Sequence, residues 1–226
     1  DMYAKCCEFE KAQKVLKQLR ARNVVTWNAL ISGYTQDGRG HESLCCFVQM
    51  QSEGICPNEV TLACILKNFA RARDINGGKQ VHIEIVNRGL LEKDIAISNA
   101  LIDMYTKCDY LSKAHEVLEV IPFRNVVSWN TLITHYAEHG FGEEALSCFE
   151  KMQLDRVSPN RVTFICSLKA CSSIGFFRKG LELYTEVIKE GLENDTFVGS
   201  SVVDMFGKWG ALSEAQEVLD DLPVRN

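Results

Sequence analysis

Two six-residue stretches of the chain each begin and end with asparagine, NVVTWN at 23–28 and NVVSWN at 125–130. A carboxamide side chain carries both a hydrogen-bond donor and an acceptor. It can therefore satisfy the polar edge of a ligand such as either pyrimidine base. A regularly spaced row of these side chains is a candidate binding site.

A structural role competes with this interpretation. An asparagine directly before a helix is a common N-cap, and that is enough to explain Asn58 or Asn160. It does not explain Asn28, Asn99 and Asn130, which fall inside predicted helices, where asparagine is a poor helix former. We therefore expect these amides to do more than cap helices.

A motif of another kind, HIE at 82–84, matches half of the H-x-E…P-C-x-x-C signature of zinc deaminases. The cysteine half is absent, and Tyr184 fills the position of His82 in a later copy of the same segment. Acidic residues are scattered along predicted helices, and no glycine-rich phosphate loop precedes a helix. We therefore expect no catalytic residue, no metal site and no cofactor.

The ten cysteines form no C-x-x-C pair, which leaves zinc ribbons and redox motifs without support. Most lie in apolar stretches such as LCCF at 44–47. They are expected to be small buried hydrophobic residues in a reducing compartment.

The composition, with 46% hydrophobic and 24% charged residues, is typical of a soluble, ordered protein, and no apolar run is long enough to span a bilayer. The net charge of −5 argues mildly against a nucleic-acid partner, because backbone phosphates attract lysine and arginine. A net charge does not describe any single face of a protein, however.

A long repeat fills the chain. Pro57-Asn58 recurs as Pro159-Asn160, 102 residues later, and DMY at 1–3 recurs at 103–105. Each 102-residue unit divides into thirds of 35, then 35 or 36, then 31 residues. Such a period is the signature of stacked structural repeats. Residues 1–23 match only the last 23 positions of the short third, and no methionine begins the chain, so we expect a fragment.

Each third of the unit predicts two helices. In 126–160, two stretches with helical spacing of apolar residues flank a break at Gly140. The predicted core face comprises Leu132, Ile133, Tyr136, Ala145, Phe149 and Met152. One hairpin cannot bury such a stripe alone, but stacked hairpins can, which predicts an all-α superhelix with a concave face.

The length cycle and its motifs resemble those of plant pentatricopeptide repeat proteins of the PLS class. The resemblance covers the whole chain and is carried by VVSWNTLI at 126–133, GEEAL at 142–146 and NALIDMYTKC at 99–108. In that family's terms, the P-type repeats are 24–58 and 126–160, the L-type repeats are 59–94 and 161–195, and the S-type repeats are 95–125, 196–226 and the partial 1–23.

The resemblance implies a right-handed superhelical solenoid that binds single-stranded RNA in a mitochondrion or chloroplast, one base per repeat, and no membrane. The fifth and last positions of a repeat read the base, and the side chain at the second position packs against it. The matching base-reading residues are Asn28, Asn58, Asn99, Asn125, Asn130, Asn160, Ser200 and Asn226. The matching base-packing residues are Val25, Ala96, Val127 and Phe197.

The L-type repeats depart from this pattern. Ala63 stands with Asp94, and Ile165 with Asp195, so an apolar side chain occupies each fifth position. We expect weak base discrimination there. The implied register is 5′-pyrimidine-any-pyrimidine-pyrimidine-any-adenine-3′.

The PLS order favours a specificity factor for cytidine-to-uridine RNA editing, with catalysis supplied by another domain or chain and with other editing factors as further partners. RNA stabilisation, processing or splicing by simple occupancy is an alternative within RNA binding. A tetratricopeptide-like scaffold for proteins is the alternative from another class, and the acidic charge is its best argument. Against it, the period of about 34 residues and the Trp-Leu-Gly pattern of those repeats are missing.

Overall fold

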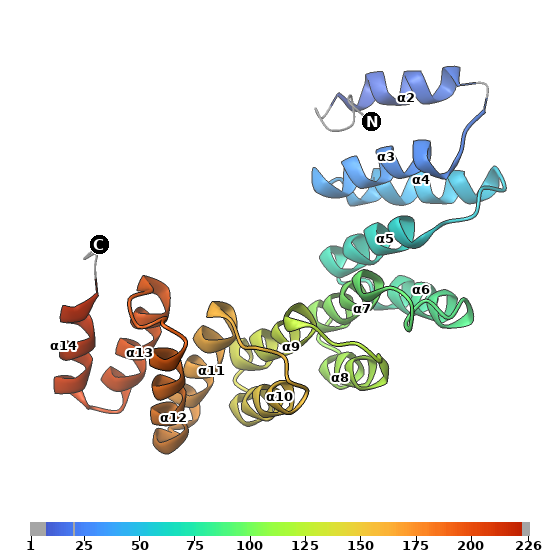
Figure 1. Ribbon diagram of the computed structural model, residues 1–226. Coiled ribbons are helices and arrows are strands. Elements are labelled where there is room, and N and C mark those ends of the chain that lie inside the picture. Colours follow the sequence, from blue (N-terminus) through green and yellow to red (C-terminus); the bar gives the residue numbers. More distant parts are fainter. Residues whose placement is uncertain (1–7, 20, 223–226) are drawn as a thin grey trace. The chain divides into compact units, whose positions relative to one another are not determined.

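The computed structural model describes residues 8–19 and 21–222, and all regular structure in those ranges is α-helical (Figure 1). The helices are α2 (Phe9–Gln18), α3 (Val24–Gln36), α4 (Gly40–Ser52), α5 (Glu59–Ala72), α6 (Ile75–Asn87), α7 (Ile95–Lys107), α8 (Leu111–Val120), α9 (Val126–Glu138), α10 (Gly142–Leu154), α11 (Arg161–Ile174), α12 (Phe177–Lys189), α13 (Thr196–Lys208) and α14 (Leu212–Asp221). None of these helices combines the length and the apolar character needed to cross a bilayer.

The chain divides into two compact units, with the boundary in the sequence between Phe123 and Arg124; the first contains α2–α8 and the second α9–α14. In the first unit α5 packs against α3 and α7, and in the second unit α11 packs against α9 and α13. Helices α4, α6, α10 and α12 each pack on their own first helix and on the next one. Within each unit, the first helices of successive hairpins therefore form one layer and the second helices form another (Figure 1).

The first helices begin where a polar residue caps them. Four asparagines form a reciprocal capping box with the residue three positions on: Asn23 with Thr26, Asn58 with Thr61, Asn125 with Ser128, and Asn160 with Thr163. Asp94 and Asp195 cap α7 and α13 by accepting from two backbone N–H groups each. Such caps satisfy backbone donors that a helix start leaves unpaired. The residue after each cap is the expected first residue of a repeat.

The hydrophobic core follows the predicted helical spacing. Leu132, Ile133, Phe149 and Met152 are all fully buried in the second unit. Burying one such side chain contributes about 1.5–3 kcal/mol, so the stacked faces hold the hairpins together. The expected all-α class of two-helix repeats is confirmed for the described residues.

The cysteines follow the expectation only in part. Five are buried: Cys46, Cys108, Cys148, Cys166 and Cys171. The expectation of burial is wrong for Cys45 and Cys56, which are exposed, and Cys64 is half-buried. Cys45 differs from Cys46 because neighbouring residues of a helix point about 100° apart, and only one of them faces the core. Cys6 and Cys7 lie outside the described residues.

Candidate functional site

Two side chains of the first P-type repeat, Asn28 and Asn58, join Thr61 of the next repeat in what we term the first amide cluster. Asn28 Nδ2 donates to Asn58 Oδ1 at 2.8 Å. Thr61 Oγ1 donates to Asn28 Oδ1 at 2.6 Å and lies 3.0 Å from Asn58 Oδ1. Asn28 comes from the middle of α3, and the other two residues form the capped start of α5. The packing of α5 on α3 therefore brings the fifth and last positions of one repeat together.

The same arrangement occurs 102 residues later, in the second amide cluster of Asn130, Asn160 and Thr163. Asn130 Nδ2 donates to Asn160 Oδ1 at 3.0 Å, and Thr163 Oγ1 donates to Asn130 Oδ1 at 2.7 Å. Here α9 supplies the fifth position and the start of α11 supplies the other two. Two copies of one geometry in separate units show that the repeat itself dictates it.

Helix capping fixes which way the last-position amides point. The backbone N–H of Thr61 bonds the Asn58 side chain at 3.2 Å, and that of Thr163 bonds the Asn160 side chain at 3.2 Å. A backbone N–H can only donate, so the side-chain atom that meets it is Oδ1. Nδ2 of each amide then has no bonding partner within the described residues and offers its N–H groups outward. In the free protein, the last-position amides of the two P-type repeats therefore direct Oδ1 toward the helix start.

The S-type repeats carry their candidate residues on α7, at the start of α9 and on α13. Asn99 is half-buried on α7 in the first unit, whereas Asn125 caps α9 in the second unit, with Ser128 N–H donating to its Oδ1 at 3.0 Å. Ser200 is exposed on α13, and its hydroxyl donates back to the Thr196 carbonyl oxygen at 2.6 Å. Asn226 lies outside the described residues, so the adenine assignment stays a prediction.

In the L-type repeats, the last-position side chains cap the next helix through one carboxylate oxygen. Asp94 Oδ1 accepts from two backbone N–H groups at the start of α7, at 2.7 and 3.3 Å. Asp195 does the same for α13, at 3.0 and 3.1 Å. The fifth positions, Ala63 and Ile165, are half-buried and have no polar atom beyond the backbone. This geometry supports weak base discrimination by these two repeats.

A row of exposed side chains accompanies the amides at the second position of each repeat. Val25 is 69% exposed, Val127 is 53% exposed and Phe197 is 66% exposed. Ala96 is also exposed. The L-type repeats carry equivalents that the sequence interpretation left out, Val60 and Val162, at 53% and 44% exposed. Extending the second-position rule to every repeat would have found them.

Phe197 has an additional partner. The guanidinium of Arg161 lies over its ring, 5.3 Å from the ring centre, and forms an ion pair with Asp195 at 3.4 Å. In the first unit, Glu59 stands in place of Arg161 and Ala96 in place of Phe197, so this stack is specific to the second unit. An aromatic ring and a guanidinium plane are both surfaces on which unstacked bases can lie.

The HIE motif at 82–84 serves packing between helices. His82 shares a 2.7 Å hydrogen bond with the Tyr105 hydroxyl of α7, and Glu84 pairs with Arg88. Burial, assisted by Lys113, lowers the pKa of His82, and burial raises the pKa of Tyr105 to about 12. Both rings are therefore uncharged at neutral pH. Among the described residues, no group of three potential metal ligands comes together.

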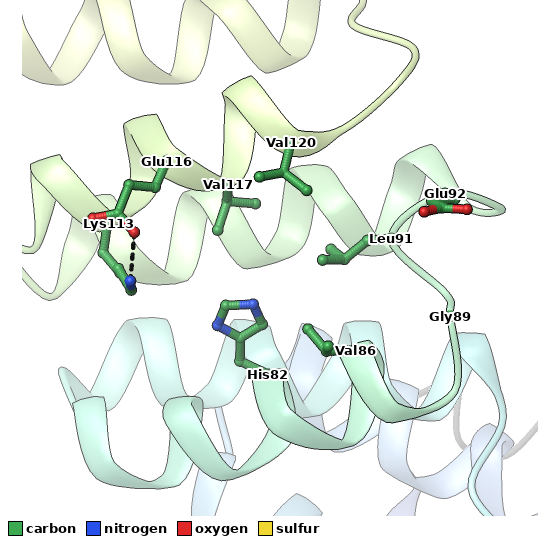
Figure 2. Close-up of a pocket in the computed structure, with 9 residues that line it drawn as sticks. All are labelled: His82, Val86, Gly89, Leu91, Glu92, Lys113, Glu116, Val117 and Val120. Carbon is green, nitrogen blue, oxygen red and sulfur yellow. Dashed lines mark hydrogen bonds and ion pairs between the residues drawn. The ribbon is translucent and has the colours of Figure 1, made fainter.

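His82 also points into a pocket of about 280 Å³ between α6 and α8 (Figure 2). Four apolar side chains form most of its wall: Val86, Leu91, Val117 and Val120. Lys113 and Glu116 pair with each other at its rim. The pocket lies between second helices, whereas the amide clusters lie on first helices, so it is a separate feature.

Comparisons with known proteins agree with the described geometry. A model of the PPR repeat family matches residues 22–71 and 124–173, and a model of the single PPR repeat matches 97–126. The Arabidopsis thaliana pentatricopeptide repeat-containing protein At1g06140, mitochondrial, is 36% identical over 100% of this chain and 40% of its own length. At4g18520, chloroplastic, from the same plant is 34% identical over 99% of this chain and 36% of its own length. The chain thus spans well under half of these relatives.

Solved structures share the fold. The maize pentatricopeptide repeat protein PPR10 superposes with a TM-score of 0.71 at 23% identity, over 99% of this chain and 34% of that one. The PPR domain of Arabidopsis thaliana protein-only RNase P 1, solved in complex with tRNA, gives a TM-score of 0.60 at 12% identity, over 83% of this chain and 95% of that one. The matched repeat models together cover more than half of the sequence, and with these similarities they make the chain a member of the pentatricopeptide repeat family.

Proposed function

We propose that the chain binds single-stranded RNA sequence-specifically, one base per repeat, through the second, fifth and last positions of its repeats. The observation that carries this proposal is the amide cluster, which occurs twice with the same three residue positions and nearly the same distances. A hydrogen-bonded pair of amides is more than a helix cap needs.

The chemistry of the amide clusters fits pyrimidines. Both cytosine and uracil carry an acceptor at O2, and cytosine has a second acceptor at N3, so an outward amide N–H finds a partner on either base. The exposed valines beside the clusters, Val25 and Val127, offer apolar surface against which a base can pack. Contact between the face of a base and an apolar side chain tolerates any sequence, because every base has such a face, so the amides are left to provide selectivity.

The register that follows is 5′-pyrimidine-any-pyrimidine-pyrimidine-any-adenine-3′ from the N-terminus onward. The first base faces the first amide cluster, the third base faces the Asn99/Asn125 repeat, and the fourth base faces the second amide cluster. The bases marked any face the L-type repeats, whose fifth positions are the apolar residues Ala63 and Ile165. A PPR domain of the same fold has been solved in complex with tRNA, which supports RNA as the ligand.

Within RNA binding, the 35/35–36/31 length cycle of the PLS type supports a role as the recognition part of an RNA editing factor. In that role the deamination of cytidine is performed by another domain or protein, and this array selects the site. RNA processing or stabilisation by occupancy is the alternative. The organelle names of the relatives support a mitochondrial or chloroplast location.

RNA selection from a random pool, followed by sequencing, tests the binding proposal. We expect enrichment of pyrimidines at the first, third and fourth positions of a six-base window. Enrichment of purines at these positions would contradict the register. Binding of peptides in a parallel display experiment, with no RNA enriched, would instead favour the protein-scaffold alternative.

A further inference from the structure

Thr61 and Thr163 occupy the third position of the repeat that follows each amide cluster, and both are fully buried. Each hydroxyl donates to the fifth-position amide of the preceding repeat, at 2.6 and 2.7 Å, and accepts from the N–H of the last-position residue, at 3.1 and 3.0 Å. A hydroxyl has a single proton to donate, and the shorter distance directs it to Asn28 and Asn130 rather than to the capping oxygens.

These hydroxyls complete a fixed network. The capping oxygen of Asn160 is already bound by a backbone N–H, so the Asn130 atom that faces it has to be Nδ2. Thr163 Oγ1 then holds the other end of the same amide. With both ends bound, the Asn130 side chain has a single orientation, and its remaining N–H group and carbonyl lone pair point in set directions.

The sequence shows the same association in every repeat whose two positions can be compared. Where the fifth position is asparagine, the third position of the next repeat is a hydroxyl residue: Asn28 with Thr61, Asn99 with Ser128, and Asn130 with Thr163. Where the fifth position is apolar, the corresponding residue is apolar too: Ala63 with Ile97, and Ile165 with Val198. The hydroxyl residue also completes a capping box in α5, α9 and α11, whereas Asp94 and Asp195 cap α7 and α13 without one. What capping does not require is the hydrogen bond from Thr61 to Asn28 and from Thr163 to Asn130.

We propose that Thr61 and Thr163 are positioning residues for base recognition, which hold the fifth-position amide of the preceding repeat in the orientation that meets the RNA base. This inference rests on the RNA-binding proposal and deepens it. It makes the selectivity of one repeat depend on a buried hydroxyl of the next repeat, although that hydroxyl does not touch the base.

The test compares three variants of the whole chain, Thr163→Val, Thr163→Ser and Thr26→Val. Valine removes the hydroxyl with little change in shape, and serine restores it, as Ser128 does naturally. Thr26→Val is the matched control, because Thr26 forms the same capping box with Asn23 while its hydroxyl donates to the Asn23 carbonyl oxygen, at 2.8 Å. Affinities are measured for four RNAs that differ only at the fourth base.

We expect Thr163→Val to reduce the preference for pyrimidines over purines at the fourth base by roughly threefold to tenfold, the value of one net hydrogen bond. Thr163→Ser should keep the preference, and Thr26→Val should leave it unchanged even if it lowers stability. Equal loss of affinity for all four RNAs in Thr163→Val, with the preference intact, would overturn the inference and leave capping as the role of Thr163.

Nuclear magnetic resonance separates this inference from the RNA-binding proposal. The side-chain amide signals of Asn130 should shift and exchange faster with solvent in Thr163→Val than in the wild type or in Thr26→Val, with no RNA present. Unchanged Asn130 signals would refute the positioning role whether or not RNA binds. Shifted signals in a protein that selects no RNA sequence would refute the proposed function instead, while the hydroxyl would still be shown to orient the amide.

Discussion

Asn160 takes part in two kinds of hydrogen bonding at once. Its Oδ1 accepts from the Thr163 backbone N–H and from Asn130 Nδ2, and its own Nδ2 is left for a ligand. One atom of the side chain therefore serves the fold, while the other is available for the base recognition proposed above. A substitution that changes only the outward atom should change selectivity and leave the helix start intact.

Asn160→Asp makes this change. A carboxylate still caps α11, because aspartate is as good an N-cap as asparagine. Its outward oxygen now accepts instead of donating, which suits the N3–H of uracil and opposes the N3 lone pair of cytosine. We expect the uracil-to-cytosine affinity ratio at the fourth base to rise about threefold or more, since a mismatched base typically costs about 1–3 kcal/mol.

Titration of RNAs that differ only at the fourth base measures this ratio. The control is Asp94→Asn in an L-type repeat, where the fifth position is Ala63 and no amide pair exists. It should change the ratio at the second base much less. If Asn160→Asp leaves the ratio at its wild-type value, the asparagine is only a cap.

At the scale of the helix, the L-type repeats differ from the other repeats in the residue one turn after the fifth position, which is a lysine. Lys67 on α5 and Lys169 on α11 follow Ala63 and Ile165 by four residues, so each pair shares a helix face. Both lysines are exposed, and neither has an ion-pair partner among the described residues. A helix that cannot read a base can still contact the RNA backbone through its lysine.

Lys169→Ala should therefore weaken binding to all sequences equally. Neutralising one phosphate contact on single-stranded nucleic acid contributes about 0.7 to the slope of log affinity against log salt concentration, so the slope should fall by about that amount. Lys189→Ala, which removes an exposed lysine from the second helix α12, is the control and should leave the slope as it is. A base-dependent loss in Lys169→Ala would argue against a phosphate contact.

The turn after α10 and the equivalent turn after α4 differ in backbone strain. Arg156 has a φ of 56°, and its counterpart 102 residues earlier is Gly54, with a φ of 72°. A side chain in this left-handed region costs roughly 1 kcal/mol or more, whereas glycine adopts it freely.

Arg156→Gly should therefore stabilise the second unit by about 1 kcal/mol, as measured by urea unfolding. The reverse change, Gly54→Ala, should destabilise the first unit to a similar extent. A loss of stability in Arg156→Gly would mean that the arginine side chain makes a contribution larger than the backbone strain.

The starts of the first helices were predictable from sequence, because each follows an asparagine or aspartate that precedes an apolar stretch. The amide clusters were not, since Asn28 and Asn58 are 30 residues apart and meet only through the packing of α5 on α3. For the same reason, the role of Thr61 was missed. Ser200 was assigned to base reading by family resemblance alone, and its hydroxyl donates to the carbonyl oxygen four residues earlier, a bond that serines inside helices commonly form.

At the scale of the whole molecule, the first and last described helices are less well covered than the helices between them. Val15 on α2 is 44% exposed, whereas its counterpart Val117 on α8 is 4% exposed. Leu219 on α14 is 41% exposed, whereas Leu118 is fully buried. In a stacked array each repeat depends on its neighbours for burial, so these helices have less to hold them.

Hydrogen exchange should show this gradient. We expect the slowest amide exchange in about residues 60–190 and faster exchange in α2 and α14, because opening those helices exposes less additional apolar surface. Bound RNA should slow exchange mainly in the first helices of each unit. Equal protection of α2 and α5 would mean that α2 is held by contacts other than its packing on α3.

The last position combines helix capping with the proposed base recognition, and this combination limits which substitutions evolution can introduce there. Every residue there, from Asn23 to Asn226, is asparagine or aspartate. A new ligand preference that required leucine or lysine at this place would cost the following helix its cap, about 1 kcal/mol, before any gain in recognition. Mutation can therefore explore only the few residue types that start helices well. The residue types possible at the last position are therefore limited by helix initiation as well as by the proposed recognition of a ligand.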